Sequence, residues 1–139
     1  IVTFVNTKRP ELEFAVKPAQ TSATTVYIGL IEISTGGVDD FLDIYFDAGG
    51  SWSLECGNNA SGAATTDIGP LITTNLTTFR LVFITDTTVE WFVDGVSQGQ
   101  VACGADMPTT GLQPYAYIST TASAAKSIDV DYFRIWQNR

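Results

Sequence analysis

The chain has 139 residues, of which 45% are hydrophobic and 12% aromatic, enough apolar material for a domain with a buried core and too much for a disordered chain. Its formal net charge is −8, and positions 18–79 contain acidic residues but no Lys or Arg. Such a surface repels phosphate groups, so we expect no nucleic acid as a partner. No run of 18 apolar residues occurs, so we expect no membrane insertion.

Short stretches of alternating apolar and polar residues predict strands along the whole chain, and no segment has a helical period. Turn residues such as Gly36-Gly37 and Gly69-Pro70 separate the strands. Strands this short and this regularly spaced predict an antiparallel sandwich or barrel. The predicted strands are 3–5, 12–16, 26–33, 41–46, 51–56, 63–68, 78–85, 89–93, 98–103, 115–120 and 127–136.

Cys56 and Cys103 are the two cysteines of the chain. Cys56 alternates in phase with the apolar residues Trp52 and Leu54, and Cys103 with Val101, so both thiols are expected to point inward. The sequence leaves open whether they form a disulfide or remain two buried free thiols.

The segment 79–95 has the clearest pattern, because two strands alternate around a polar turn and end at Asp94-Gly95. Asp-Gly supplies the positive φ angles of a tight turn. We expect Trp91 and the apolar residues on the same face of the two strands, within 79–83 and 89–93, to lie in the core. Because the residues out of phase are also largely apolar, the pattern predicts burial on both faces of this hairpin.

Two further motifs follow it in order: the segment 107–118 with Pro108 and Pro114, and the closing strand 128–136 with Asp131 before an aromatic residue. Together the three resemble the concanavalin A-like lectin/glucanase superfamily of laminin-G-like modules, pentraxins and family-16 glycoside hydrolases, and especially its versions in phage virion proteins. The resemblance implies an all-β fold, an antiparallel two-sheet jelly-roll sandwich that forms a single domain over 1–139.

The chain begins with Ile1 and not Met, which favours the C-terminal part of a longer chain. The apolar residues 1–5 are then expected to pack on a partner chain or on the jelly roll itself, because an exposed apolar segment is costly.

Catalytic chemistry is not expected. The chain has no histidine, which removes Ser-His-Asp triads and histidine metal sites. Family-16 enzymes carry a Glu-x-Asp-x-x-Glu motif on one strand, and no Glu here has Asp two positions later. The acidic segment 39–47 lacks Glu and is predicted to be a solvated edge. We therefore predict that the protein is not an enzyme and does not hydrolyse β-glucans, since activity through Asp43 or Glu90 would need an acid pair assembled from separate strands.

The resemblance implies one metal site, a structural calcium held partly by Asp131 with help from Asp129. Calcium takes six to eight oxygen ligands, many from the backbone, so the sequence reveals such a site poorly. The alternative is that Asp131 caps a turn or pairs with Arg134. No other cofactor is expected.

The candidate ligand-binding residues are Tyr132, Arg134 and Trp136, which share one face of the closing strand, while the resemblance places Phe133 and Ile135 in the core. Aromatic rings beside a planar guanidinium form a platform for sugar rings or for a protein partner. The alternative is that loops or a neighbouring subunit cover this face.

Taken together, these features favour a virion-associated structural or attachment module of a capsid-decoration, fibre or tail protein at the virion surface. Its expected partners are other virion subunits or copies of itself, and a cell-surface glycan. The alternative is a carbohydrate-binding module of a secreted polysaccharide-active protein. Because fold alone does not give function, both hypotheses rest on the resemblance.

Overall fold

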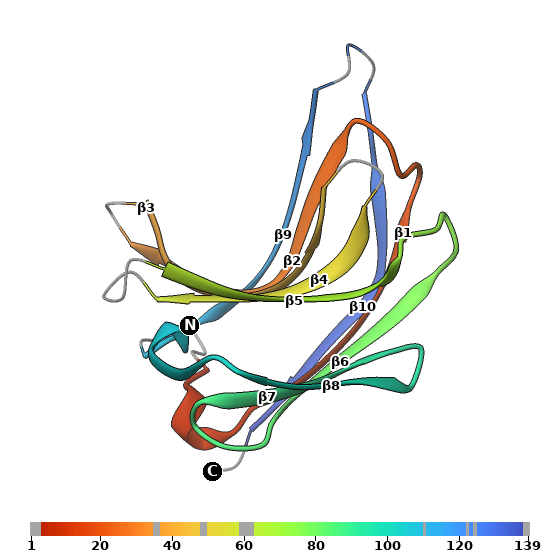
Figure 1. The fold of residues 1–139 in the computed structure, drawn as a ribbon. Coiled ribbons are helices and arrows are strands. Elements are labelled where there is room, and N and C mark those ends of the chain that lie inside the picture. The colour runs from red at the N-terminus through yellow and green to blue at the C-terminus, as the bar shows by residue number, and fades with distance from the viewer. Residues whose placement is uncertain are drawn as a thin grey trace.

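The computed structural model describes residues 4–34, 37–47, 50–58, 63–109, 111–121, 123 and 125–137. Within these residues, ten strands form two antiparallel sheets of five strands that pack face to face (Figure 1). The predicted all-β, two-sheet jelly-roll sandwich is confirmed. No helix in the described part of the chain is long and apolar enough to span a membrane.

Sheet 1 has the strand order β10-β1-β6-β7-β8. Its strands are β1 (Glu11–Pro18), β6 (Thr77–Phe83), β7 (Thr88–Val93), β8 (Val96–Ala102) and β10 (Ile128–Trp136). The sequence predicted no helix, but two single turns of 3₁₀-helix occur, η1 (Asn6–Lys8) before β1 and η2 (Gly104–Asp106) after β8.

Sheet 2 has the strand order β5-β4-β3-β2-β9. It is strongly curved, and its concave face is turned away from sheet 1 (Figure 1). Its strands are β2 (Thr24–Ser34), β3 (Gly37–Phe46), β4 (Ser51–Asn58), β5 (Ala63–Leu71) and β9 (Gln113–Thr120).

A series of contacting aromatic rings crosses the core between the sheets. The Trp52 ring packs edge-on against Phe46 of sheet 2 at 4.8 Å between centroids and against Phe79 of sheet 1 at 4.7 Å. Phe14 continues the series, stacking on Phe79 at 5.5 Å and on Phe133 at 5.3 Å. Edge-to-face and stacked pairs at these distances add to the hydrophobic stabilisation of burial, so the series holds the two sheets together.

The β6–β7 hairpin buries one face only. Its in-phase residues lie in the core, as predicted: Phe79, Leu81, Phe83, Val89, Trp91 and Val93. The prediction of burial on both faces is wrong, because sheet 1 has a packing partner on one side. On the other side Arg80 is exposed, and its guanidinium lies 5.4 Å from the centroid of the half-buried Phe92 ring. The turn to β8 has the predicted positive φ angles, 49° at Asp94 and 79° at Gly95.

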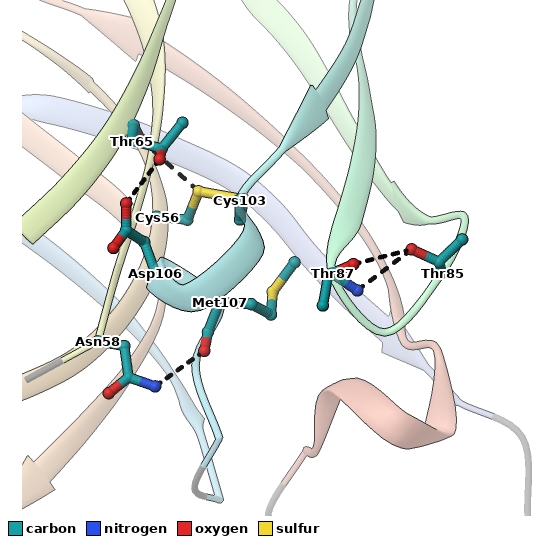
Figure 2. Close-up of a disulfide and its surroundings, with 8 residues drawn as sticks. All are labelled: Cys56, Asn58, Thr65, Thr85, Thr87, Cys103, Asp106 and Met107. Carbon is teal, nitrogen blue, oxygen red and sulfur yellow. Dashed lines mark hydrogen bonds between the residues drawn. A yellow bond between two sulfur atoms is a disulfide. The ribbon is translucent and has the colours of Figure 1, made fainter. Parts of the chain in front are cut away.

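A disulfide joins Cys56 of β4 to Cys103, which follows β8, with the Cα atoms 6.2 Å apart (Figure 2). It therefore links the two sheets. Two hydrogen bonds accompany it: Thr65 Oγ1 donates to Asp106 Oδ2 at 2.7 Å, and Asn58 Nδ2 donates to the carbonyl of Met107 at 2.9 Å (Figure 2). Together these contacts fasten the segment after β8 to β4 and β5.

Of the predicted strand 3–5, the described residues Phe4 and Val5 show one bridge, at Phe4. The Phe4 amide donates to the Leu112 carbonyl at 2.9 Å, and the Leu112 amide donates to the Phe4 carbonyl at 2.8 Å. Phe4 also packs against the core, so this end of the segment contacts the jelly roll itself. Residues 1–3 lie outside the described residues, and a partner chain for this segment remains a prediction.

Trp91 is fully buried, and its indole N–H donates to Asp67 Oδ2 at 2.8 Å. Because both the packing and this hydrogen bond are lost, Trp91→Ala should lower the free energy of unfolding by about 3–5 kcal/mol in urea denaturation. Trp136→Ala is the matched control: that side chain is 46% exposed and should change stability by less than about 1 kcal/mol. Equal effects of the two changes would contradict the packing described.

Replacing both cysteines with alanine should lower the free energy of unfolding by about 4 kcal/mol, the chain-entropy value for a cross-link between residues 47 apart. Urea denaturation with and without reductant checks this. Reductant should destabilise the wild type and leave the double variant unchanged, and a reductant-insensitive wild type would be inconsistent with the disulfide.

Candidate functional site

A pocket of about 420 Å³ lies on the concave face of sheet 2. Its position follows from strand alternation: on β3, Leu42 and Ile44 point into the core, so Phe41 and Asp43 point to the opposite face. The same alternation applies to the strands on either side. The pocket is lined by Tyr27, Ile31, Phe41, Asp43, Glu55, Tyr115 and Tyr117.

One row of residues runs across the floor of the pocket, perpendicular to the strands. Gly29 of β2 lies in register with Tyr115 of β9 on one side and with Asp43 of β3 on the other. Asp43 in turn lies opposite Glu55 of β4. The register therefore brings a tyrosine and two carboxylates from three strands into one line.

Gly29 leaves the space that this line needs. A Cβ atom at this position would lie 2.6 Å from Asp43 Cα and 2.8 Å from Asp43 Cβ, closer than real side chains approach. Without a side chain there, the Tyr115 hydroxyl reaches across β2 and donates a hydrogen bond to Asp43 Oδ2. Gly57 plays a similar part, because a Cβ there would collide with the Phe41 ring.

Asp43 is 1% exposed, and its Oδ1 atom is buried without a hydrogen-bond partner. The pKa of Asp43 is raised to about 8: burial is the main cause and the nearby Glu55 carboxylate adds to it, while the hydrogen bond from Tyr115 acts in the opposite direction. At neutral pH this carboxyl group therefore keeps its proton. Burial and the charge of Asp43 raise the pKa of Tyr115 as well, so the phenol stays a hydrogen-bond donor.

Glu55 is half-buried, and burial raises its pKa. Residues directly opposite each other on antiparallel strands have Cβ atoms about 4.5–5.5 Å apart. Asp43 and Glu55 stand opposite each other in this way, and retaining glycosidases use two carboxyl groups about 5–5.5 Å apart, so the register makes these two residues candidates for an acid pair. Two carboxyl groups in different environments can divide the roles of proton donor and ionised partner.

A tyrosine ladder, formed by Tyr117, Tyr27 and Tyr45, lies beside the acid row. The three residues are in register on β9, β2 and β3, and the ring centroids are 6.2 Å and 5.5 Å apart. Burial, followed by the charge of Glu55, raises the pKa of Tyr27 and of Tyr45. Tyr27 and Tyr45 therefore present protonated hydroxyl groups, and the ladder as a whole presents aromatic surface next to the carboxyl pair.

The predicted ligand residues Tyr132, Arg134 and Trp136 lie elsewhere, on the outer face of sheet 1. Tyr132 donates a hydrogen bond to Glu13 Oε1 at 2.9 Å, and the Arg134 guanidinium lies 4.7 Å from the centroid of the Tyr132 ring. Phe133 and Ile135 pack against the core, as the resemblance implied. The predicted platform thus exists, but on the opposite side of the sandwich from the pocket, and its role in binding remains a prediction.

Asp129 and Asp131, the predicted calcium ligands, are both exposed on β10. Asp129 lies opposite Lys17, and Asp131 sits at a bulge where the pairing of β10 with β1 shifts. In the described ranges no three His, Cys, Asp or Glu side chains converge as a metal site would require. A calcium ion bound with backbone oxygens stays a prediction.

Comparison with known proteins identifies this architecture. No protein-family model matches the chain, and no characterised protein matches it in sequence. Among solved structures, it is similar to a β-glucanase of Bacillus licheniformis, with a TM-score of 0.76, 15% identity and coverage of 100% of this chain and 69% of the enzyme. The fold is the jelly roll of β-glucanases and alginate lyases.

Two further structures share it. A β-1,3-glucanase from Mycobacterium marinum matches with a TM-score of 0.71 and 14% identity over 92% of this chain. Alginate lyase A1-II′, a member of polysaccharide lyase family 7, matches with a TM-score of 0.70 and 12% identity over 99% of this chain. The chain spans 63% and 65% of the length of these two enzymes, less than two thirds.

The prediction that the protein is not an enzyme is contradicted by these comparisons, because the similar structures are those of β-glucanases and an alginate lyase. The concanavalin A-like fold is borne out, whereas the resemblance to phage virion proteins is not shown. The sequence lacks the one-strand carboxylate motif, but the structure places two carboxyl residues from neighbouring strands, Asp43 and Glu55, opposite each other. Glu55 alternates with the core residues Leu54 and Cys56, which marks it as outward-facing, but its pairing with Asp43 depends on the β3–β4 register.

The raised pKa of Asp43 predicts how the free energy of unfolding depends on pH. A group whose pKa rises from 3.8 unfolded to about 8 folded stabilises the fold below the lower value and loses that effect as pH rises to the upper one. As the pH rises from about 4 to about 8, the free energy of unfolding should therefore fall, by up to about 1.4 kcal/mol for each pH unit. Asp43→Asn should flatten this slope in urea denaturation.

The control is Asp129→Asn, which changes an exposed aspartate on sheet 1. It should leave the slope of the wild type unchanged. A slope that is the same in the wild type and in Asp43→Asn would show that Asp43 does not hold its proton in the fold.

Proposed function

We propose that this chain is a carbohydrate-active domain that binds a polysaccharide in the concave pocket and hydrolyses a glycosidic bond there. The observation that carries the proposal is the pairing of Asp43, whose pKa is raised to about 8, with Glu55 on the next strand. The β-glucanases and alginate lyase of similar fold support the carbohydrate-active class.

The roles of the two carboxyl groups follow from their environments. Asp43 keeps its proton at neutral pH and would donate it to the oxygen of the leaving sugar as the glycosidic bond breaks. Glu55, the more exposed group, would attack the anomeric carbon as a carboxylate and form a glycosyl ester. Water would then attack the ester and give its proton to Asp43, which restores both groups.

Tyr115 acts in this scheme as a positioning residue. Its hydroxyl holds Oδ2 of Asp43, which leaves Oδ1 as the oxygen of this carboxyl group without a partner. The tyrosine ladder and Phe41 offer apolar ring surface for the sugar, and phenolic hydroxyl groups for its polar edges.

Hydrolysis fits the pocket better than elimination. A lyase that acts on a uronic acid must neutralise the sugar carboxylate and remove a proton next to it, and histidine, lysine or arginine commonly serve these roles. The chain has no histidine, and no Lys or Arg lines the pocket. The disulfide suits an oxidising environment, so the proposal includes a secreted or extracellular location.

Release of reducing ends tests the proposal, with purified chain on a panel of neutral, cationic and anionic polysaccharides. We expect turnover of at least one member, reduced about 100-fold or more by Asp43→Asn and by Glu55→Gln, the usual size of a lost acid–base group. Glu90→Gln is the matched control, because Glu90 lies on sheet 1, where it accepts a hydrogen bond from Ser97 at 2.8 Å.

Two outcomes would contradict the proposal in different ways. Saccharide binding with no turnover, or turnover untouched by both variants, would remove the catalytic role of the acid pair. No binding to any member of the panel would remove the carbohydrate function of the pocket altogether.

A further inference from the structure

We propose that the saccharide bound in the pocket carries positively charged amino groups, as in a polymer of glucosamine. This inference rests on the proposed function and names the substrate class of the same site. Three independent features of the pocket support it: its charge, a buried oxygen without a partner, and its aromatic lining.

The charge of the pocket is one-sided. None of the five strands of sheet 2 contains a Lys or Arg residue, whereas Asp43 and Glu55 both line the pocket. The ion pairs found among the described residues lie on or beside sheet 1 instead: Arg9 with Asp86, Arg80 with Glu11, and Arg134 with Glu13. The strands of sheet 2 therefore supply no cation to balance the charge of Glu55, and a positively charged ligand would supply one.

The buried oxygen is Oδ1 of Asp43, which has no hydrogen-bond partner although the residue is 1% exposed. Buried polar atoms are nearly always satisfied, so an exception calls for an explanation such as a functional role. An ammonium group brings three N–H donors together with its charge, enough to reach both Asp43 and Glu55. A sugar hydroxyl brings a single donor and no charge.

The aromatic lining favours a cation as well. Tyr27, Phe41, Tyr115 and Tyr117 all line the pocket. The faces of aromatic rings attract ammonium groups, and cages of such rings combined with carboxylates recognise cations in proteins. Uronic acids would instead bring a negative charge toward Glu55 with nothing to offset the repulsion.

A metal ion fits less well than an amine. Calcium requires six to eight oxygen ligands, but the described residues contain no convergence of three His, Cys, Asp or Glu side chains. An ammonium group needs fewer oxygen ligands, because it has three N–H donors and is also attracted by aromatic rings, and the pocket provides two carboxyl groups among such rings.

Proton release gives the inference a distinctive readout. Burial raises the pKa of Glu55, and none of the residues found to line the pocket is a Lys or Arg that would oppose this shift. An ammonium group bound beside Glu55 would favour the charged form of this carboxyl group, the form that attacks the sugar, so at mildly acidic pH binding should release a proton from Glu55. An uncharged sugar would not cause this release.

Titration calorimetry with four oligosaccharides of equal length provides the test: a glucosamine oligomer, its N-acetylated twin, a neutral β-glucan oligomer and an oligouronate. At mildly acidic pH the glucosamine oligomer should bind at least about tenfold more tightly than its twin, the order expected for a desolvated cation beside aromatic rings. At the same mildly acidic pH, titration in buffers of different ionisation enthalpy should detect the released proton for this ligand alone.

The matched variants are Glu55→Gln in the pocket and Glu90→Gln on sheet 1. Glu55→Gln should remove most of the tenfold preference for the glucosamine oligomer over its N-acetylated twin, and Glu90→Gln should leave this preference unchanged. Amide shifts of the wild type should map the glucosamine oligomer to β2, β3, β4 and β9, which keeps the test independent of how well a variant folds.

The outcomes separate the inference from the proposed function. Equal affinity for the charged oligomer and its twin, or tighter binding of the neutral glucan, would overturn the inference and leave the carbohydrate function in place. A preference that survives Glu55→Gln, or shifts confined to sheet 1, would also overturn it, because the amine would then bind outside the pocket. Binding of none of the four would remove the proposed function itself.

Discussion

The packing of Trp52 between Phe46 and Phe79 is the contact on which the rest of the structure depends. It joins the two sheets and so fixes which face of each strand is turned inward. Because side chains alternate along a strand, the buried residues Leu42, Ile44 and Phe46 determine that Asp43 and its neighbours in phase lie on the other face. The chemistry of the concave face is thus set by the core beneath it.

The pocket depends on two glycine residues as much as on the side chains that line it. At Gly29 the absent side chain lets a tyrosine from β9 reach an aspartate on β3, and at Gly57 it makes room for the Phe41 ring. A carboxyl group buried with one unsatisfied oxygen costs folding free energy that a well-packed apolar residue would not. Sites that break the usual rules of burial in this way are commonly functional.

Much of the fold could be predicted from the sequence. Alternation along each strand placed Trp91 in the core, and Asp94-Gly95 marked a turn, because both are local patterns that a single strand or turn determines. The inward direction of Cys56 and Cys103 followed from the same alternation. Their pairing did not, since it depends on how two sheets approach each other in space.

The candidate site escaped prediction for the same reason. Tyr115 and Asp43 are 72 residues apart, and they meet because β9 and β3 both pair with β2. Glu55 reaches Asp43 through the register of a hairpin, and a shift of one residue would turn its side chain to the other face. The closing strand offered Tyr132, Arg134 and Trp136 as a plausible platform, but only the strand order shows that β10 belongs to sheet 1.

The two sides of the pocket are held with different strength. Glu55 precedes Cys56, which is bound to the other sheet by the disulfide, and Asn58 on the same strand donates to the Met107 carbonyl. Tyr115 and Tyr117 lie on β9, an edge strand that pairs with β2 alone in the sheet. Local stability follows such differences in cross-linking and pairing. The β4 side of the pocket, which carries Glu55, is therefore the more firmly held, and the β9 side, at the edge of the sheet, has the greater freedom to move.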